Sequence, residues 1–232
     1  MKYVLFLLLA AASVSPGLSA ETLHYLVNWP SGLSLGEATL TSNGWSGGSG
    51  AEAQSQRWEF NFTVDASIPG FAIKDHYHSK AAGSGICSSV LEKTASRGSR
   101  HSEETDTFDQ DQHRVTRESH AGGGKSEYTV PDCARDALSF IQFVRDELAH
   151  GRLAPQQPVV LGAAYDVRLE FAGTQTVKMI DKPVEADRIR ATIKGPASNL
   201  TVEILFAHDA ARTPVSARIP LPLGAFTVEL TH

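Results

Sequence analysis

Two short motifs contain residue types that could catalyse a reaction or bind a metal ion. Residues 44–48 read Gly-Trp-Ser-Gly-Gly, the G-x-S-x-G pattern of the nucleophilic serine turn in α/β-hydrolases. That turn needs a helix after the serine, but here Gly and Ser follow and then a strand-like segment, which predicts a mobile loop. Residues 109–113 read Asp-Gln-Asp-Gln-His, like the start of a calcium loop. Arg114 and His120 occupy the positions where that loop needs Gly and Glu, so we expect a charged hairpin tip with Phe108 directed inward.

Two histidines two residues apart could share a zinc ion. His76 and His78 are expected on one face of a strand, because side chains alternate along a strand. Phe71, Ile73 and Tyr77 mark the opposite face as the buried one. The sequence places no third ligand nearby, so we interpret both histidines as part of a solvated face.

Three charged residues near the predicted helix could orient the polar head group of a ligand. They are Arg135, Asp136 and Arg145. The interpretation that we favour is ion pairing between the helix rim and charges at the end of the sheet. No nucleophile is paired with a base in the sequence, so we expect no catalytic residue, no metal site and no cofactor.

The two cysteines, Cys87 and Cys133, could form a disulfide. An even cysteine count in an exported protein favours a bond, which would stabilise the fold by about 4 kcal/mol in the chain-entropy model. Two separate buried thiols are the alternative. Two thiols without further ligands make a poor zinc site.

The first 20 residues have the layout of a signal peptide. Lys2 precedes an apolar run over 3–14, and small residues follow up to Ala20. The run is shorter than the roughly 20 residues needed to cross a bilayer, and no later apolar segment is long enough. We therefore expect residues 1–20 to be removed and 21–232 to form one β-rich domain in the periplasm or cell envelope of a bacterium.

The charge of the expected mature chain argues against two classes of partner. Removing Lys2 leaves 20 basic residues against 26 acidic ones, a formal net charge of −6. This balance provides no electrostatic reason to bind nucleic acid or anionic lipid.

Strict alternation of apolar and polar residues dominates the sequence. Trp58, Phe60, Phe62 and Val64 alternate with polar residues, which predicts a strand with one buried face. The same period occurs in 165–171, 188–193, 202–206 and 226–230, and further strands are expected near 22–29, 34–42, 71–79, 86–94, 100–108 and 112–119. Parallel strands covered on both faces would show continuous apolar runs, so the sheet of about a dozen strands should be mainly antiparallel.

One segment has helical spacing. Apolar residues at 137, 138, 141, 144 and 148 predict a helix near 134–150, with Asp132 as its N-cap and Gly151 closing it. A sheet this large curls, and its concave apolar face needs filling. We therefore predict a large bent sheet, or half-barrel, wrapped around one long helix. The alternative is a closed β-barrel with the helix capping one mouth.

Several short stretches resemble an exported bacterial family known as domain of unknown function 3108. They are the helix residues 136–145 with Gly151, the C-terminal segments 209–218 and 222–230, the opening stretches 25–29 and 36–38, and, more loosely, 108–109. The resemblance implies an exported, β-rich envelope protein without an assigned activity. By fold-level analogy it is akin to periplasmic half-barrels that carry lipids or lipoproteins.

These observations lead to two expected functions. The first is non-catalytic binding of an apolar or lipid-like ligand inside the half-barrel. The second is a structural or assembly role with another envelope protein. An apolar cavity of roughly 300 Å³ or more would favour binding, whereas a filled core with a bare edge strand would favour the partner role.

Overall fold

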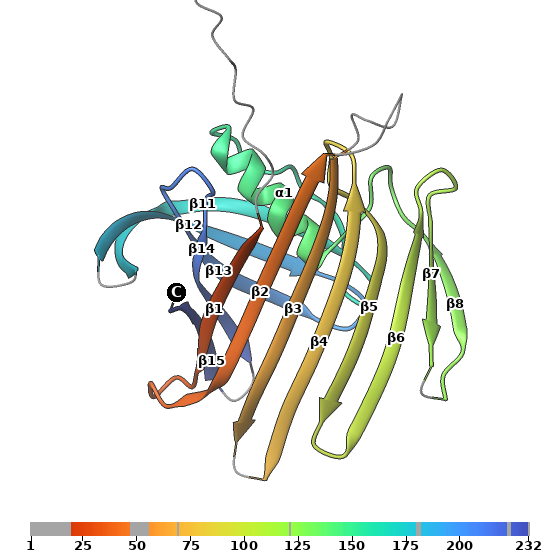
Figure 1. Ribbon diagram of the computed structural model, residues 1–232, viewed down its shortest axis with the longest axis horizontal. Coiled ribbons are helices and arrows are strands. Elements are labelled where there is room, and N and C mark those ends of the chain that lie inside the picture. The colour runs from red at the N-terminus through yellow and green to blue at the C-terminus, as the bar shows by residue number, and fades with distance from the viewer. Residues whose placement is uncertain are drawn as a thin grey trace, which may run out of the picture.

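The computed structural model describes residues 20–46, 56–68, 70–120, 122–179, 182–221 and 224–231. The expected signal peptide up to residue 19, and Gly47 and Gly48 of the serine motif, lie outside the described residues. The described residues form one 15-stranded sheet and one helix (Figure 1).

The strands follow one another in hairpins on both sides of the helix. In chain order they are β1 (Glu21–Asn28), β2 (Ser34–Ser46), β3 (Gln56–Ile68), β4 (Phe71–Ala82), β5 (Cys87–Arg97), β6 (Arg100–Asp109), β7 (Arg114–Ser119), β8 (Lys125–Thr129), β9 (Arg135–Asp136), α1 (Ala137–Ala149), β10 (Gln157–Val160), β11 (Ala164–Met179), β12 (Lys182–Lys194), β13 (Asn199–Ala207), β14 (Pro214–Leu221) and β15 (Gly224–Leu230).

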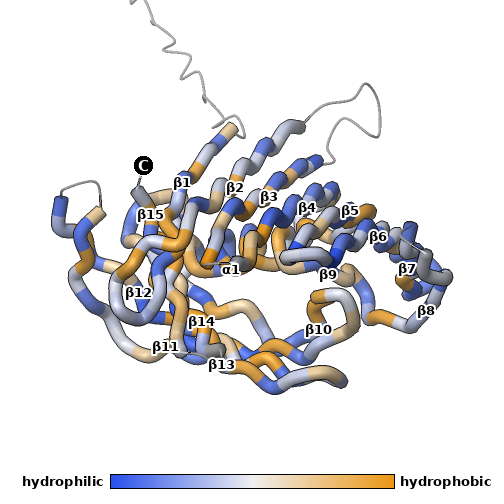
Figure 2. The backbone as a smooth tube through the Cα atoms, turned by 90° about the horizontal axis from the view of Figure 1, so that it is seen from below, coloured by the Kyte–Doolittle hydropathy of each residue, from blue (hydrophilic) through white to orange (hydrophobic). Residues whose placement is uncertain are grey.

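The sheet is bent so that its two halves face each other. Strands β1–β8 form the N-terminal half in chain order, β9–β15 form the C-terminal half, and β1 pairs with β15 to join them. In Figure 2, β1 to β6 form one wall and β11 to β14 the opposite wall. All pairings are antiparallel except β9 with β10. Because the described sheet ends at β8 and β9 without closing, the predicted half-barrel is confirmed and the closed-barrel alternative is wrong.

The predicted alternation forms the inner face. On β3, Phe60 is 1% exposed, and on β12, Ile189 is fully buried. Strands β8 and β9 were not predicted from the sequence, because β9 has two residues and β8 carries exposed polar residues without an apolar period. These short strands pair at the ends of the sheet, where a neighbour on one side is sufficient.

Helix α1 begins later than predicted. Its N-cap is Asp136, whose Oδ1 accepts hydrogen bonds from Leu138 N at 2.7 Å and Ser139 N at 3.1 Å. The prediction of Asp132 was wrong: its side chain is 91% exposed and pairs with His113 at 3.1 Å. The helix ends at Ala149, and Gly151 follows with a φ of 72°, the left-handed conformation expected of a helix-closing glycine.

A buried polar network fastens the start of α1 to the N-terminal half of the sheet. The fully buried carboxylate of Asp136 accepts hydrogen bonds from Ser79 Oγ at 2.6 Å on β4 and from Ser88 Oγ at 2.7 Å on β5. Cys87 and Cys133 form a disulfide beside it, as the sequence predicts, with their Cα atoms 4.7 Å apart. The beginning of the helix is therefore fixed covalently and by hydrogen bonds.

The opposite face of α1 packs against the C-terminal half. Phe140, Val144 and Leu148 are buried there, with exposed fractions of 6% or less, and contact a cluster on β10 to β13 and the loop before β10. Its other buried members are Ala154, Val159, Val167, Ile189, Ala191 and Phe206. The helix is thus held between the two walls, but it does not fill the space between them.

Candidate functional site

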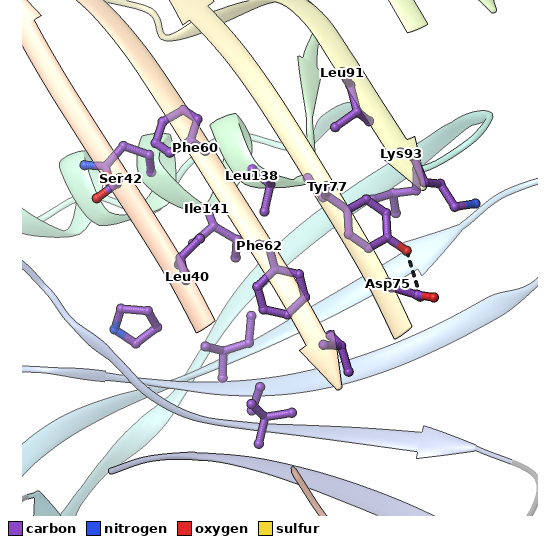
Figure 3. A pocket seen from close by; sticks show the side chains of 18 of the residues that line it. Leu40, Ser42, Phe60, Phe62, Asp75, Tyr77, Leu91, Lys93, Leu138 and Ile141 are labelled. Carbon is purple, nitrogen blue, oxygen red and sulfur yellow. Dashed lines mark hydrogen bonds between the residues drawn. The ribbon is translucent and has the colours of Figure 1, made fainter. Parts of the chain in front are cut away.

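A cavity of about 470 Å³ lies between the two halves of the sheet, beside α1. Most of its wall is apolar and comes from strands distant in sequence. The apolar lining side chains on the strands and on the β10–β11 turn are Tyr25, Leu40, Phe60, Phe62, Val64, Tyr77, Leu91, Val160, Leu161, Ile204, Pro214, Ala217, Ile219 and Val228. Figure 3 shows several of them directed toward a common space. The bend of the sheet brings them together, because alternate side chains along each strand point toward its concave face.

One stripe of α1 forms a further part of the wall. Ala137, Leu138, Ile141, Gln142 and Arg145 all line the cavity, and their spacing places them on one side of the helix. Figure 3 shows Leu138 and Ile141 projecting toward side chains on β2, β3 and β4. Because α1 has 13 residues, it is only about 20 Å long and covers part of the concave face.

A second, smaller cavity of about 120 Å³ lies next to the C-terminal half of the sheet. It shares Ala137, Ile141, Leu161 and Ile204 with the first cavity, and all of its lining residues are apolar. Its remaining lining residues are Phe140, Val144, Val159, Val167, Leu169, Ile189, Ala191, Ile193, Val202 and Phe206. The apolar space therefore continues past the helix toward the C-terminal half.

One end of the larger cavity is polar. Asp75, Lys93, Glu104 and Asp106 line it from β4, β5 and β6. Across from them, Leu161 and Gly162 come from the turn after β10. A Cβ atom at Gly162 would lie 3.1 Å from the guanidinium of Arg117. A glycine there allows the turn to approach this polar end closely.

Most charges at the polar end are paired. Asp75, which is 6% exposed, accepts hydrogen bonds from the Arg97 guanidinium, and the hydroxyl of Tyr77 donates to Asp75 at 3.3 Å. Glu104 pairs with Lys93 at 3.2 Å and with Arg117. Burial, followed by the negative charge of Asp75, raises the pKa of Tyr77 to about 12.

Asp106 differs from its neighbours. It is 5% exposed and lines the cavity, yet its Oδ1 has no hydrogen-bond partner among the described residues. Burial raises the pKa of Asp106 to about 6, and the charges of Glu104 and Asp136 act in the same direction, against those of Arg117 and Lys93. A buried carboxylate that lacks a partner is costly and marks a candidate site.

The three charged residues predicted near the helix do not converge on the cavity. Only Arg145 lines it, and this 4%-exposed side chain pairs with Glu21 at 2.7 Å. Arg135 donates to the carbonyl of Gly85 and lies over the ring of Phe143 at 3.7 Å. Asp136 caps the helix. The favoured interpretation is therefore confirmed for Arg145, which pairs with a charge on the sheet.

The two histidines lie on the outer face of β4. His76 is exposed, and the ring nitrogens Nε2 and Nδ1 of His78 donate hydrogen bonds to the carboxylates of Glu59 at 2.7 Å and Glu92 at 2.9 Å. Burial opposes protonation of His78, but the hydrogen bonds to both carboxylates outweigh it and raise its pKa. Within the described ranges, no group of three His, Cys, Asp or Glu side chains is arranged to hold a metal ion.

The remaining motifs have structural roles. Asp109 Oδ1 accepts from Gln112 N at 2.9 Å in the β6–β7 hairpin, and Phe108 is buried as predicted. Within this charged tip, the side-chain amide of Gln110 forms hydrogen bonds with the backbone of Ser88 and Ala134. Residues 44–46 of the serine motif belong to β2, so the loop prediction was wrong there. Pairing with β3 continues to Ser46 and extends the strand.

Sequence reasoning missed the polar end of the cavity. Asp75 occupies an inward position between Ile73 and Tyr77, and Asp106 precedes the inward Phe108 by two residues. A charged residue at the apolar phase of an alternating strand is the signal that could have indicated this site.

Comparisons with known proteins agree with this architecture. A solved structure with a TM-score of 0.62 is described as a β-barrel-like protein of domain of unknown function DUF1849 from Brucella abortus. The two chains are 7% identical, and the match covers 92% of this chain and 96% of the other, so the likeness shows the fold alone.

In the part of the chain that the structure describes, no helix has the length and apolar character needed to span a membrane.

Two further comparisons concern membership of a family. A search of curated proteins finds no match to the sequence. The family model described as protein of unknown function DUF3108 matches residues 24–231, and the chain therefore belongs to the DUF3108 family.

Proposed function

We propose that this protein binds the apolar chain of a lipid-like ligand in the cavity beside α1, without chemically changing it. The observation that carries the proposal is the cavity of about 470 Å³, lined by apolar side chains from both halves of the sheet and from the helix. Ligand sites are typically concave, about 300–1,000 Å³ in volume, and mostly apolar with a few polar groups. This cavity has all of these properties.

The lining residues also support binding rather than catalysis. The cavity wall contains no histidine or cysteine among the described residues. Ser42 lines it, but its hydroxyl donates at 3.4 Å to Glu21, a carboxylate that is already paired with Arg145. A covalent mechanism needs a nucleophile within reach of a general base.

The proposed location is the bacterial periplasm or cell envelope. Residues 1–20 have the layout of a signal peptide. The Cys87–Cys133 disulfide supports an oxidising compartment, because such bonds are rare in the cytosol.

Displacement of a fluorescent fatty-acid probe tests the proposal. Ala217 lines the cavity on β14 and pairs with Ile204 and Val228, two other lining residues. Ala217→Trp should fill this space and reduce probe affinity at least about tenfold. The matched control is Arg218→Trp, which adds the same ring at the adjacent exposed position and should bind like the wild type.

Two results would contradict the proposal. One is wild-type protein that shows no saturable binding of the probe. The other is equal loss of binding in the Ala217 and Arg218 variants, which would indicate a surface site. Circular dichroism of each variant confirms that it is folded before its binding is compared.

One observation favours the second candidate function, an assembly role with another envelope protein. Strand β8 is an edge of the described sheet, and four of its five residues are exposed. An exposed edge strand can pair with a strand of another protein, although Lys125 on a short strand disfavours unspecific pairing. Cross-linking from Ser126 to a partner, together with no binding of the probe, would favour this function.

A further inference from the structure

The polar end of the cavity has balanced charges. Three cations, Lys93, Arg97 and Arg117, face three carboxylates, Asp75, Glu104 and Asp106, on β4 to β7. A ligand head group with a net charge would disturb this balance beside the buried carboxylates of Asp75 and Asp106. Burial of an unbalanced charge is far more costly than burial of a neutral polar group.

The pairing pattern leaves the carboxylate of Asp106 without a bound cation, and the hydroxyl of Tyr128 on β8, on which the charge of Asp106 acts, is also buried without a partner among the described residues. Arg97 is bound to Asp75, whereas Lys93 and Arg117 are both bound to Glu104. Asp106 is the lining carboxylate whose buried oxygen has no partner in the described part of the chain. A buried acceptor without a donor is unfavourable, so a ligand that supplies the donor gains affinity.

The chemistry of Asp106 discriminates among head groups. A carboxylate head offers no hydrogen at neutral pH and would be repelled by Asp106, while the nearby cations Lys93 and Arg117 are already engaged. An ammonium head could donate to Asp106, but it would approach the same two cations. A hydroxyl donates one hydrogen bond and adds no charge.

From these observations, and resting on the proposed function, we propose that the cavity selects amphiphiles with a neutral, hydroxyl-bearing head group. The apolar chain lies along Phe62, Leu138 and Ile141, and the head-group hydroxyl donates to Asp106. A fatty-acyl glycerol has this chemistry.

Three competitors with the same chain length test the proposal. Monolauroylglycerol, laurate and laurylamine each displace a bound fluorescent probe from delipidated wild-type protein at about pH 8, where Asp106 is ionised. Monolauroylglycerol should bind about tenfold more tightly than laurate or laurylamine, the ratio expected when one buried polar group gains or lacks its partner.

A pair of variants assigns the selectivity to Asp106. Asp106→Asn supplies an amide N–H to laurate and removes the repulsion, so the preference for the glycerol over laurate should fall to about parity. Glu103→Gln makes the same kind of change on the outer face of the same strand, β6, and should keep the preference of the wild type.

The outcomes separate this inference from the proposed function. If wild-type protein binds all three compounds equally, or prefers laurate or laurylamine, the head-group inference is wrong and chain binding remains. If the probe binds but none of the three compounds displaces it, the head-group inference is also wrong. If the probe itself shows no saturable binding to wild-type protein, the proposed function fails as well. The wild-type ranking decides the question even if Asp106→Asn does not fold.

Discussion

The buried carboxyl of Asp106 should make the unfolding free energy depend on pH in an unusual direction. Its pKa rises from 3.8 to about 6 in the folded protein, mainly because of burial. The folded state therefore holds the proton more tightly than the unfolded chain does. The stabilisation by this proton is fully present below about pH 3.8 and is lost as the pH rises through 6. The difference between the two pKa values corresponds to about 3 kcal/mol.

Asp106→Asn removes this titration, and urea unfolding of delipidated protein measures the effect. The unfolding free energy of the wild type, taken relative to that of the variant, should fall by about 3 kcal/mol between about pH 3 and pH 8. The comparison cancels the contributions of other titrating groups, and also any constant cost of the substitution. Glu103→Gln serves as the control, because this side chain is on the exposed face of β6. Parallel curves for the wild type and Asp106→Asn would refute the reasoning.

Three further predictions concern the stability of the fold. Replacing Cys87 and Cys133 by Ala should reduce the unfolding free energy by about 4 kcal/mol, because the bond closes a loop of 46 residues, and denatured unreduced wild type should show no free thiol. In urea unfolding, Phe140→Ala should cost about 3–5 kcal/mol, whereas Ile141→Ala, which enlarges an existing cavity, should cost about 2 kcal/mol or less; equal costs would contradict the described packing. Asp136→Ala should cost at least about 3 kcal/mol by leaving the first backbone N–H groups of the helix and the buried hydroxyl of Ser79 without an acceptor, and a cost below 1 kcal/mol would contradict this role.

The overall fold could be predicted because local patterns determine it. Alternation in β3 and in β12 specifies one buried face, and the helical spacing of Phe140, Val144 and Leu148 specifies the single helix. A bent sheet wrapped around one helix follows from these two patterns together. The sequence could not show that the sheet stays open, because closure would require the short edge strands β8 and β9 to pair with each other through hydrogen bonds.

The candidate site was only partly predictable, because it depends on contacts between distant residues. The apolar wall follows from alternation, but the pairing of Glu104 with Lys93 and Arg117, and the missing partner of Asp106, depend on three-dimensional placement. The N-cap was assigned to Asp132 because an Asp side chain just before a helical segment is a favoured cap. The cap is instead Asp136, whose carboxylate accepts hydrogen bonds from Ser79 on β4 and Ser88 on β5.

Methyl NMR during titration with monolauroylglycerol tests the central claim of an apolar binding cavity most directly. The methyl signals of Leu138, Ile141 and Ile204, which line the cavity, should shift and saturate together. Those of Leu33 and Leu153, which are 64% and 37% exposed and do not line it, should stay in place. Unchanged signals from the three lining residues, or shifts confined to Leu33 and Leu153, would contradict the account.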